Sequence, residues 1–195
     1  MLKKISLLGA ALLAIALMSG CESRKIMAEE VLQVPTAAKL YTKQNIWYEK
    51  PGDIYCLNYQ KGEILPFGTE VINIDISNDS VSFTEKKSGR QFRIFFRKEM
   101  MMIPVEDYVK NLLTTKTAEE LAQAAKSKPA NFEKIHRGIV EEGMSRKEVL
   151  LAYGYPVALR TPSLTEDTWI FWDDELQSKR VVFKGDKVIQ ILKLD

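Results

Sequence analysis

The sequence is poor in the residues that build most metal and nucleotide sites. It has one histidine and two cysteines among 195 residues. A zinc site with several histidines is therefore excluded, because zinc sites in proteins draw three or four ligands from histidine, cysteine and carboxylates. Glycine-rich phosphate loops, long internal repeats and low-complexity segments are also missing from the sequence. These absences argue against metal-dependent, nucleotide-binding and repeat-protein functions.

Long apolar runs are equally scarce, and the longest lies at the start of the chain. Residues 5–18 are apolar or small and follow Lys3 and Lys4. A helix that spans a bilayer needs roughly 20 apolar residues, so this run is short for that purpose. A basic start, a short apolar stretch and small residues at its end are typical of a secretory signal. No later run in the sequence is long enough to span a membrane.

The end of this run, residues 17–21 with the sequence LMSGC, resembles the lipobox of bacterial lipoproteins. The resemblance implies that residues 1–20 are a signal peptide. It also implies that the Cys21 sulfur carries a diacylglycerol and that the new amine is acylated, for example with palmitate. Such acyl chains anchor firmly, at roughly 0.8 kcal/mol per buried CH₂ group. An aspartate directly after the lipidated cysteine would favour retention in the inner membrane. Because this position is Glu22, the sequence favours an outer-membrane, periplasm-facing location. An uncleaved anchor and an ordinary secretory signal are the alternatives.

Removal of the signal peptide changes the charge and the cysteine chemistry. It takes away two lysines and no acidic residue, so the net charge falls from +2 to zero over 175 residues. Such a chain lacks the electrostatic footprint of a nucleic-acid-binding protein. With Cys21 lipidated, Cys56 has no cysteine partner, which excludes a disulfide scaffold. Cys56 stands in an apolar run and is expected to be a small buried side chain rather than a reactive thiol.

The middle of the chain predicts a tether, a β-rich domain and a helical connector. We expect a lipidated tether over residues 21–38, with a short helix that Pro35 ends. Alternating isoleucines at Ile72, Ile74 and Ile76, followed by turns at 78–80 and 87–90, predict a small barrel or sandwich over residues 39–103. Residues 65–69 resemble the strand entry of bacterial SH3-like domains. Pro104 and a capping box at Thr117 predict a helical connector over residues 104–129.

Residues 130–195 predict two helices followed by three strands. Asn131 is a candidate cap for a helix that runs to Glu141, and Ser145 with Glu148 forms a capping box for a helix that ends at Tyr153. Strands are expected at 167–173, 179–184 and 187–194, and the pair 185–186 is a hairpin signal. The order predicts an α+β fold, with two helices on one face of a three-stranded antiparallel sheet behind the β-rich domain.

The same region resembles the SmpA/OmlA (BamE-like) domain. The resemblance rests on an ordered set of positions: Gly143, Met144, Ser145, Glu148, Val149, Gly154, Pro156, Trp169 and Phe171. It implies an outer-membrane lipoprotein that does no chemistry, needs no cofactor or metal, and is accessory to the machine that inserts β-barrel proteins or to envelope integrity. The preceding β-rich domain departs from that pattern, because the assembly subunit lacks it.

The last third also carries the candidate partner-binding residues. Trp169 and Phe171 lie two apart on one predicted strand and share a face, whereas Ile170 and Trp172 share the opposite face. If helices cover one face, the other is a candidate interface, and Tyr155 beside it is a further candidate. The alternative is that Trp172 covers a core edge or packs on the preceding domain.

The sequence gives little support for a catalytic, calcium-binding or lipid-binding site. A Cys56–His136 nucleophile pair would have to cross the domain boundary. The acidic run at 173–175 suits a solvated hairpin loop better than a Ca²⁺ site, and the basic turn at 86–90 suits a solvated turn better than a lipid contact. We therefore expect a non-catalytic protein-interaction module and not an enzyme. The alternative is a cell-wall (peptidoglycan) or ligand-binding lipoprotein that uses the SH3-like domain.

Overall fold

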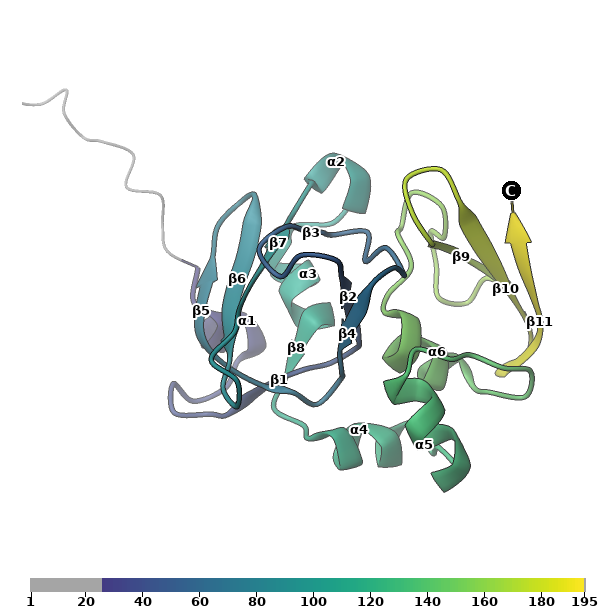
Figure 1. Cartoon of the computed structure of the whole chain (residues 1–195), viewed down its shortest axis with the longest axis horizontal. Helices are drawn as coiled ribbons and strands as arrows, with labels where there is room; N and C mark the ends of the chain where they lie inside the picture. Colours follow the sequence, from purple (N-terminus) through teal and green to yellow (C-terminus); the bar gives the residue numbers. More distant parts are fainter. Residues whose placement is uncertain (1–25, 195) are drawn as a thin grey trace, which may run out of the picture.

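In the computed structural model, which describes residues 26–194, the chain has an α+β fold whose two larger sheets lie side by side (Figure 1). The first sheet is curled and has the strand order β3-β7-β6-β5-β1-β8. A separate two-stranded ribbon, β2 with β4, lies against it. The strands of this first half are β1 Leu40–Thr42, β2 Ile46–Tyr48, β3 Ile54–Tyr55, β4 Glu63–Leu65, β5 Glu70–Ile76, β6 Ser80–Glu85, β7 Gln91–Phe95 and β8 Leu113–Thr114.

The alternation in β5 is interrupted. Ile76 is 4% exposed and lies in the first core, the cluster of buried apolar side chains that residues 28–113 and Val157 form. Ile72 is 39% exposed. The prediction that the three isoleucines share one buried face is therefore wrong for Ile72. The pairing of β5 with β6 shifts register between Ile72 and Asp75, and Asn73 there has a φ of 52°. An extra residue at such a bulge reverses the face on which the following side chains lie, and Val71 takes the buried position instead.

The first half extends beyond the predicted β-rich domain at both ends. Ile26 forms an isolated antiparallel β-bridge with Ile76. Helix α1 (Ala28–Leu32) contacts α3 (Val105–Leu112) and β5. The predicted tether over 21–38 is therefore part of the fold from residue 26 onward, because the apolar side chains of residues 26–34 pack on the first core.

The predicted connector over 104–129 is not a separate element either. One face of α3 is buried in the first core, and β8 pairs with β1. The apolar residues of α3 recur at the spacing of an amphipathic helix, which explains why this segment packs rather than connects. The short helix α2 (Lys98–Met101) precedes it.

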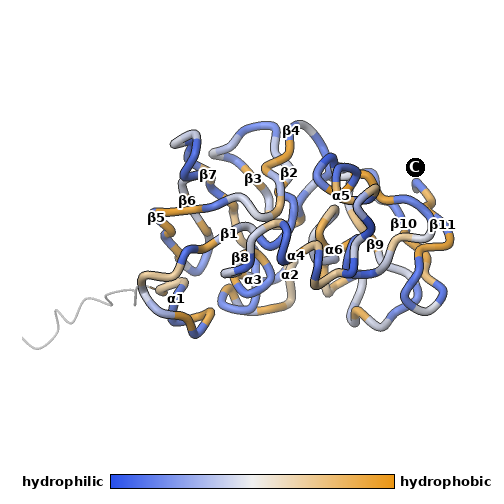
Figure 2. Tube along the Cα trace, turned by 90° about the horizontal axis from the view of Figure 1, so that it is seen from below, coloured by the Kyte–Doolittle hydropathy of each residue, from blue (hydrophilic) through white to orange (hydrophobic). Residues whose placement is uncertain are grey.

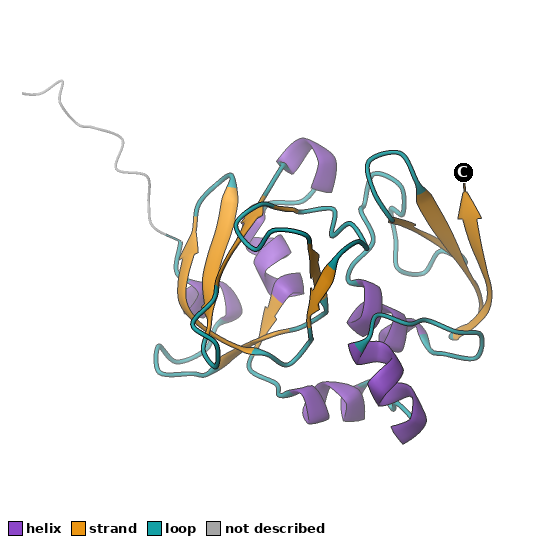
Figure 3. Cartoon of the chain, viewed as in Figure 1, coloured by secondary structure: helices purple, strands orange, loops and turns teal. Residues whose placement is uncertain are grey.

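The second half has a three-stranded antiparallel sheet with the order β11-β10-β9. Its strands are β9 Thr168–Trp172, β10 Ser178–Lys184 and β11 Lys187–Leu194, which confirms the predicted strands to within a residue at each end. The helices α4 (Ala118–Ala124), α5 (Pro129–His136) and α6 (Arg146–Tyr153) contribute to the same core and lie at the bottom of the view in Figure 3. Figure 2 shows the two halves from below, with hydrophobic segments in the strands of each.

The helices of the second half differ from prediction at one point. Helix α5 begins at Pro129 and ends at His136, so Asn131 is not its cap and the helix does not reach Glu141. Proline suits the first helical turn because its missing N–H would have no partner there. Gly138, with a φ of 64°, follows the last turn. The capping boxes at Thr117 and Ser145 are confirmed.

Candidate functional site

The two halves meet along a seam that is held by Asn45, a fully buried residue after β1. Its backbone N–H donates to the Leu151 carbonyl oxygen at 2.9 Å. Its side-chain Nδ2 donates to the carbonyl oxygens of Ile135 at 2.6 Å and Ala152 at 3.2 Å. Its Oδ1 accepts the backbone N–H of Phe67 at 2.9 Å. A single residue of the first half therefore binds the ends of both α5 and α6.

Asn58 makes a second connection across the seam. Its Nδ2 donates to the Tyr153 carbonyl oxygen at 3.0 Å and to the Asn45 carbonyl oxygen at 3.1 Å. Its Oδ1 accepts the backbone N–H of Trp47 at 2.9 Å. Nearby, the Gln44 side-chain oxygen accepts the backbone N–H of Tyr155 at 3.0 Å. These amide side chains are buried, so each bond replaces one that water would otherwise make.

Side chains and backbone of the first half bind the last carbonyl groups of helix α6. The last four carbonyl groups of a helix have no partner within it. In α6, the Leu150 oxygen accepts the Gly154 N–H, and the next three oxygens accept donors from Asn45 and Asn58. The first half therefore caps a helix of the second half, and the two halves form one body.

Gly154 lies at this junction and belongs to the set of residues that resembles the SmpA/OmlA domain. Its φ is 85°, and a Cβ atom there would lie 2.6 Å from Gln44 Nε2 and 3.0 Å from Asn58 Nδ2. Both the backbone conformation and the neighbouring amides require glycine. Gly143, with the same φ of 85°, stands in a turn where an added Cβ atom would meet nothing within 4 Å, and its N–H donates to the Val188 carbonyl.

Glu148 is the one buried carboxylate of that set. Its Oε2 accepts the Ser145 N–H at 2.7 Å, and its Oε1 accepts Ser127 Oγ and Asn131 Nδ2, each at 2.8 Å. Burial opposes ionisation, but these hydrogen bonds prevail and lower the pKa of Glu148. Asn131, predicted as a cap for α5, thus binds the first turn of α6 instead.

The remaining residues of the set are structural. Met144, Val149, Trp169 and Phe171 are at most 4% exposed and lie in the second core, and Pro156 is buried. The guanidinium of Arg146 lies over the Trp169 ring. The set therefore describes a core and its turns, not a surface that a partner reaches.

The predicted interface residues Ile170 and Trp172 are half-buried. Trp172 packs against the first core, its carbonyl accepts the Gln60 N–H at 3.0 Å, and Arg160 lies over its ring. The Ile170 N–H donates to Thr161 Oγ1 at 3.0 Å. For Trp172 the alternative, packing on the preceding domain, is the one that the structure shows.

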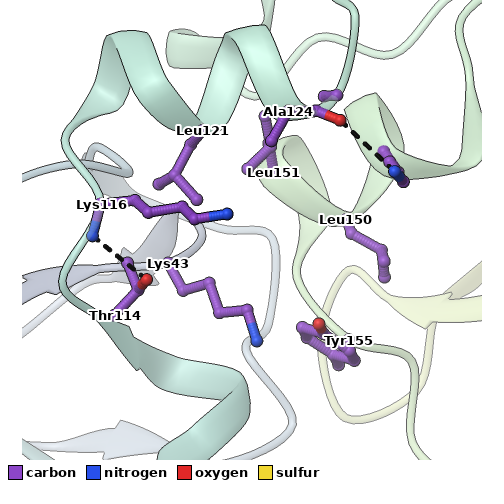
Figure 4. Close-up of a pocket in the computed structure, with 10 residues that line it drawn as sticks. Lys43, Thr114, Lys116, Leu121, Ala124, Leu150, Leu151 and Tyr155 are labelled. Atoms are coloured by element: carbon purple, nitrogen blue, oxygen red, sulfur yellow. Dashed lines mark hydrogen bonds between the residues drawn. The ribbon is translucent and has the colours of Figure 1, made fainter. Parts of the chain in front are cut away.

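Tyr155, the third predicted residue, lines a cleft of about 380 Å³ at the seam (Figure 4). Its floor is apolar and includes Leu121, Leu150 and Leu151. Lys43, Lys116 and Lys147 surround it, and no carboxylate is among its lining residues. The cleft is open to solvent, and its volume lies near the lower end of the range for ligand pockets in proteins. It is the leading candidate for a binding site.

A second groove of about 260 Å³ lies on β2, β3 and the following loop. Tyr55 and Tyr59 stack there with ring centres 5.8 Å apart. The indole N–H of Trp47, also in the lining, is buried and has no partner within the described part of the chain. Glu175 from the β9–β10 loop completes the groove. The arrangement offers aromatic faces and a carboxylate to a ligand.

The sequence-level candidates for chemistry are not brought together. Cys56 is buried in the first core, where burial raises the pKa of its thiol. His136 lies at the end of α5 and packs on Phe132 and on Phe67, which the loop before β5 contributes to the second core. Within residues 26–194, no group of three or more metal-ligating side chains is found.

The charged residues of the two turns bind partners close to them in the fold. Asp173 pairs with Lys179 at 2.5 Å, and Asp174 accepts the N–H groups of Leu176 and Gln177 in the hairpin loop. In the basic turn, Lys86 pairs with Glu70 at 2.6 Å. Among the helices of the described part, none is long and apolar enough to cross a bilayer.

Neither family models, nor curated proteins, nor solved structures give a match to this chain. Cys21 lies outside the described residues. Sequence reasoning missed the seam residues Asn45 and Asn58 and the three lysines of the cleft. The only signal was a polar run at 43–45 between two short apolar stretches, which is typical of any loop.

Proposed function

We propose that this chain is an outer-membrane lipoprotein, anchored through Cys21 and facing the periplasm, whose folded part is a non-catalytic protein-interaction module. The resemblance of residues 130–195 to the SmpA/OmlA domain supports this proposal. Helices α5 and α6 precede a three-stranded antiparallel sheet, in the order that the resemblance implies. The proposed partner is an envelope protein, with barrel-assembly subunits as the first candidates.

One observation carries the proposal: the seam between the two halves is locked by buried hydrogen bonds and leaves an open cleft with an apolar floor. A rigid body with a partly apolar concave surface suits binding, since little conformational entropy is lost when a partner docks. The cleft is lined by three lysines, Thr114, Tyr155 and apolar side chains, a mixture that suits contact with a protein surface.

The anchor would hold this body near the bilayer. Only four residues separate Cys21 from Ile26, where the described fold begins. At about 3.4 Å per residue, five steps of extended chain reach roughly 17 Å. A partner of this module would therefore be a membrane protein or a protein held close to the membrane surface.

The test is purification of the lipidated protein from gently cross-linked outer membranes, with identification of co-purifying proteins by mass spectrometry. We expect a defined envelope protein, lost when Leu150 in the cleft is replaced by Glu and retained when exposed Leu159 is replaced by Glu. Deletion of residues 130–195 is not a suitable control, because it removes the partners of Asn45 and takes Val157 and Trp172 from the first core. Recovery of the same proteins with both variants would contradict the proposal.

The aromatic groove supports a second candidate, a cell-wall-binding lipoprotein. Stacked Tyr55 and Tyr59 with the Glu175 carboxylate offer ring faces and a hydrogen-bond acceptor, which suit a sugar ring. Purified sacculi should then pull down the full chain but not a Tyr59→Ala variant. Equal recovery of the two proteins, or recovery of neither, would remove this candidate.

A further inference from the structure

The cleft at the seam concentrates positive charge that the described part of the chain does not neutralise. Lys43 follows β1, Lys116 follows β8, and Lys147 lies in the first turn of α6. None of the three pairs with a described carboxylate, whereas seven other pairs in the described part do form. Ammonium groups gathered in one cleft repel one another and raise the local potential. A ligand that carries negative charge would relieve this repulsion.

Two of these ammonium groups are held in place. Lys43 Nζ donates to the Lys110 carbonyl oxygen at 2.8 Å and lies 5.3 Å from the centre of the Tyr155 ring. Lys147 Nζ donates to the Ala124 carbonyl oxygen at 3.3 Å. An ammonium group has three N–H donors, so each retains donors for a ligand. Lys116 makes no side-chain bond with the described residues, and Figure 4 shows its side chain directed toward the cleft beside Lys43.

The floor of the cleft adds an apolar requirement. Leu121 and Leu151 are buried and belong to the second core, and half-buried Leu150 and Tyr155 present apolar surface to the cleft. An anion alone would leave this surface in contact with water. A ligand that matches both features carries carboxylates beside an apolar side chain.

We propose that the cleft binds an acidic peptide segment of the partner protein, with carboxylates on the three lysines and an apolar side chain on Leu121, Leu150 and Tyr155. The inference rests on the proposed function, because it names the chemistry of that partner. The cleft is open to solvent, so a segment of chain can continue out of it. A volume of about 380 Å³ accommodates a few side chains rather than the paired acyl chains of a phospholipid.

The experiment uses the full lipidated protein in detergent and a fluorescein-labelled synthetic peptide in which leucine alternates with glutamate and aspartate. The matched peptide carries glutamine and asparagine instead. Fluorescence anisotropy should show tighter binding of the acidic peptide by at least about tenfold, which weakens as salt is added. Lys116→Glu should weaken that binding by at least about tenfold, because it reverses a charge in the cleft. Lys184→Glu, a charge reversal at an exposed site outside the cleft, should leave it within about twofold.

Three outcomes would overturn the inference. Equal binding of the two peptides, or of the acidic peptide to the Lys116 and Lys184 variants, would show that the cleft does not select carboxylates. Stronger binding to phosphatidylglycerol than to phosphatidylcholine vesicles, with the difference lost in Lys116→Glu, would show that its ligand is a lipid, because the proposed Cys21 anchor would insert into both. Retention of the co-purifying envelope protein by Lys116→Glu would leave the proposed function intact but place its interface elsewhere. A melting temperature within a few degrees of the unmodified protein would confirm that each variant is folded.

Discussion

The side-chain amide of Asn58 donates to the Tyr153 carbonyl oxygen at 3.0 Å, and this single bond joins residues 95 positions apart. Asn45 makes equivalent bonds to Ile135 and Ala152. Helix ends in water can be capped by solvent, but the end of α6 is buried, so its carbonyls require protein donors. The stability of the second half therefore depends on side chains of the first.

Asn45→Ala should destabilise the whole protein. It leaves the Phe67 N–H and the Ala152 carbonyl without a partner in a buried site, whereas the Ile135 carbonyl still accepts the Gly138 N–H. Each of these two unsatisfied groups costs about 1–3 kcal/mol, so a loss of roughly 2 kcal/mol or more is expected. Urea denaturation measures it, and exposed Asn78→Ala should change stability by less than about 0.5 kcal/mol. Two separate unfolding transitions in the unmodified protein would contradict the view that the halves form one body.

Gly154→Ala and Gly143→Ala form a matched pair, because both glycines have a φ of 85°. A positive φ alone costs an alanine about 1–2 kcal/mol. Gly154 also has a ψ of −170°, in a region that is essentially restricted to glycine. Gly143→Ala should show only the cost of the positive φ, since a Cβ there meets nothing within 4 Å. Gly154→Ala should cost more, because its Cβ would lie 2.6 Å from Gln44 Nε2 and must displace the seam amides. Equal changes in the free energy of unfolding would show that the seam is loose at this point.

Local signals predicted the three strands and helix α6 of the second half, but not the bounds of α5. The capping box at Ser145, the helix end at Tyr153 and the hairpin at 185–186 each depend on residues within a few positions, so the strands and α6 followed from the sequence. The sheet order then followed from two short connections.

The seam and the first half could not be predicted in the same way. Nothing near Asn45 in the sequence indicates that its amide binds Ile135, ninety positions later. The alternation of apolar residues does not reveal the bulge in β5. The sequence also does not show that the apolar face of α3 packs on the first core. Partner choice over such separations is decided by packing, which a short stretch of sequence does not encode.

Acid should weaken the protein through Glu148. The pKa of this carboxyl is lowered in the fold, so its contribution is fully present above the unfolded value of about 4.3 and is lost as the pH falls through the folded value. Glu148→Gln should lower stability at pH 7 by about 1.5–3 kcal/mol, the range for hydrogen bonds to a charged group. The variant should also lose less stability than the unmodified protein on acidification.

Urea midpoints measured from about pH 7 to pH 3 test this prediction across the titration range of a carboxyl group. Exposed Glu142→Gln is the control, and it should retain the pH dependence of the unmodified protein. If Glu148→Gln and the unmodified protein lose stability in parallel below about pH 4.3, the carboxylate does not stabilise the first turn of α6.

Trp172→Ser separates the two roles considered for this residue. If Trp172 were a free binding surface, a polar replacement would leave stability unchanged. Because the side chain is half-buried and packs on the first core, we expect a loss of about 2 kcal/mol, less than the roughly 3–5 kcal/mol typical of a fully buried tryptophan. Ile189→Ser, at a site 47% exposed on the same sheet, should cost less than about 0.5 kcal/mol. If the Trp172 variant is as stable as the Ile189 variant, the Trp172 side chain does not stabilise the contact between the halves. Trp172 would then again be a candidate interface residue.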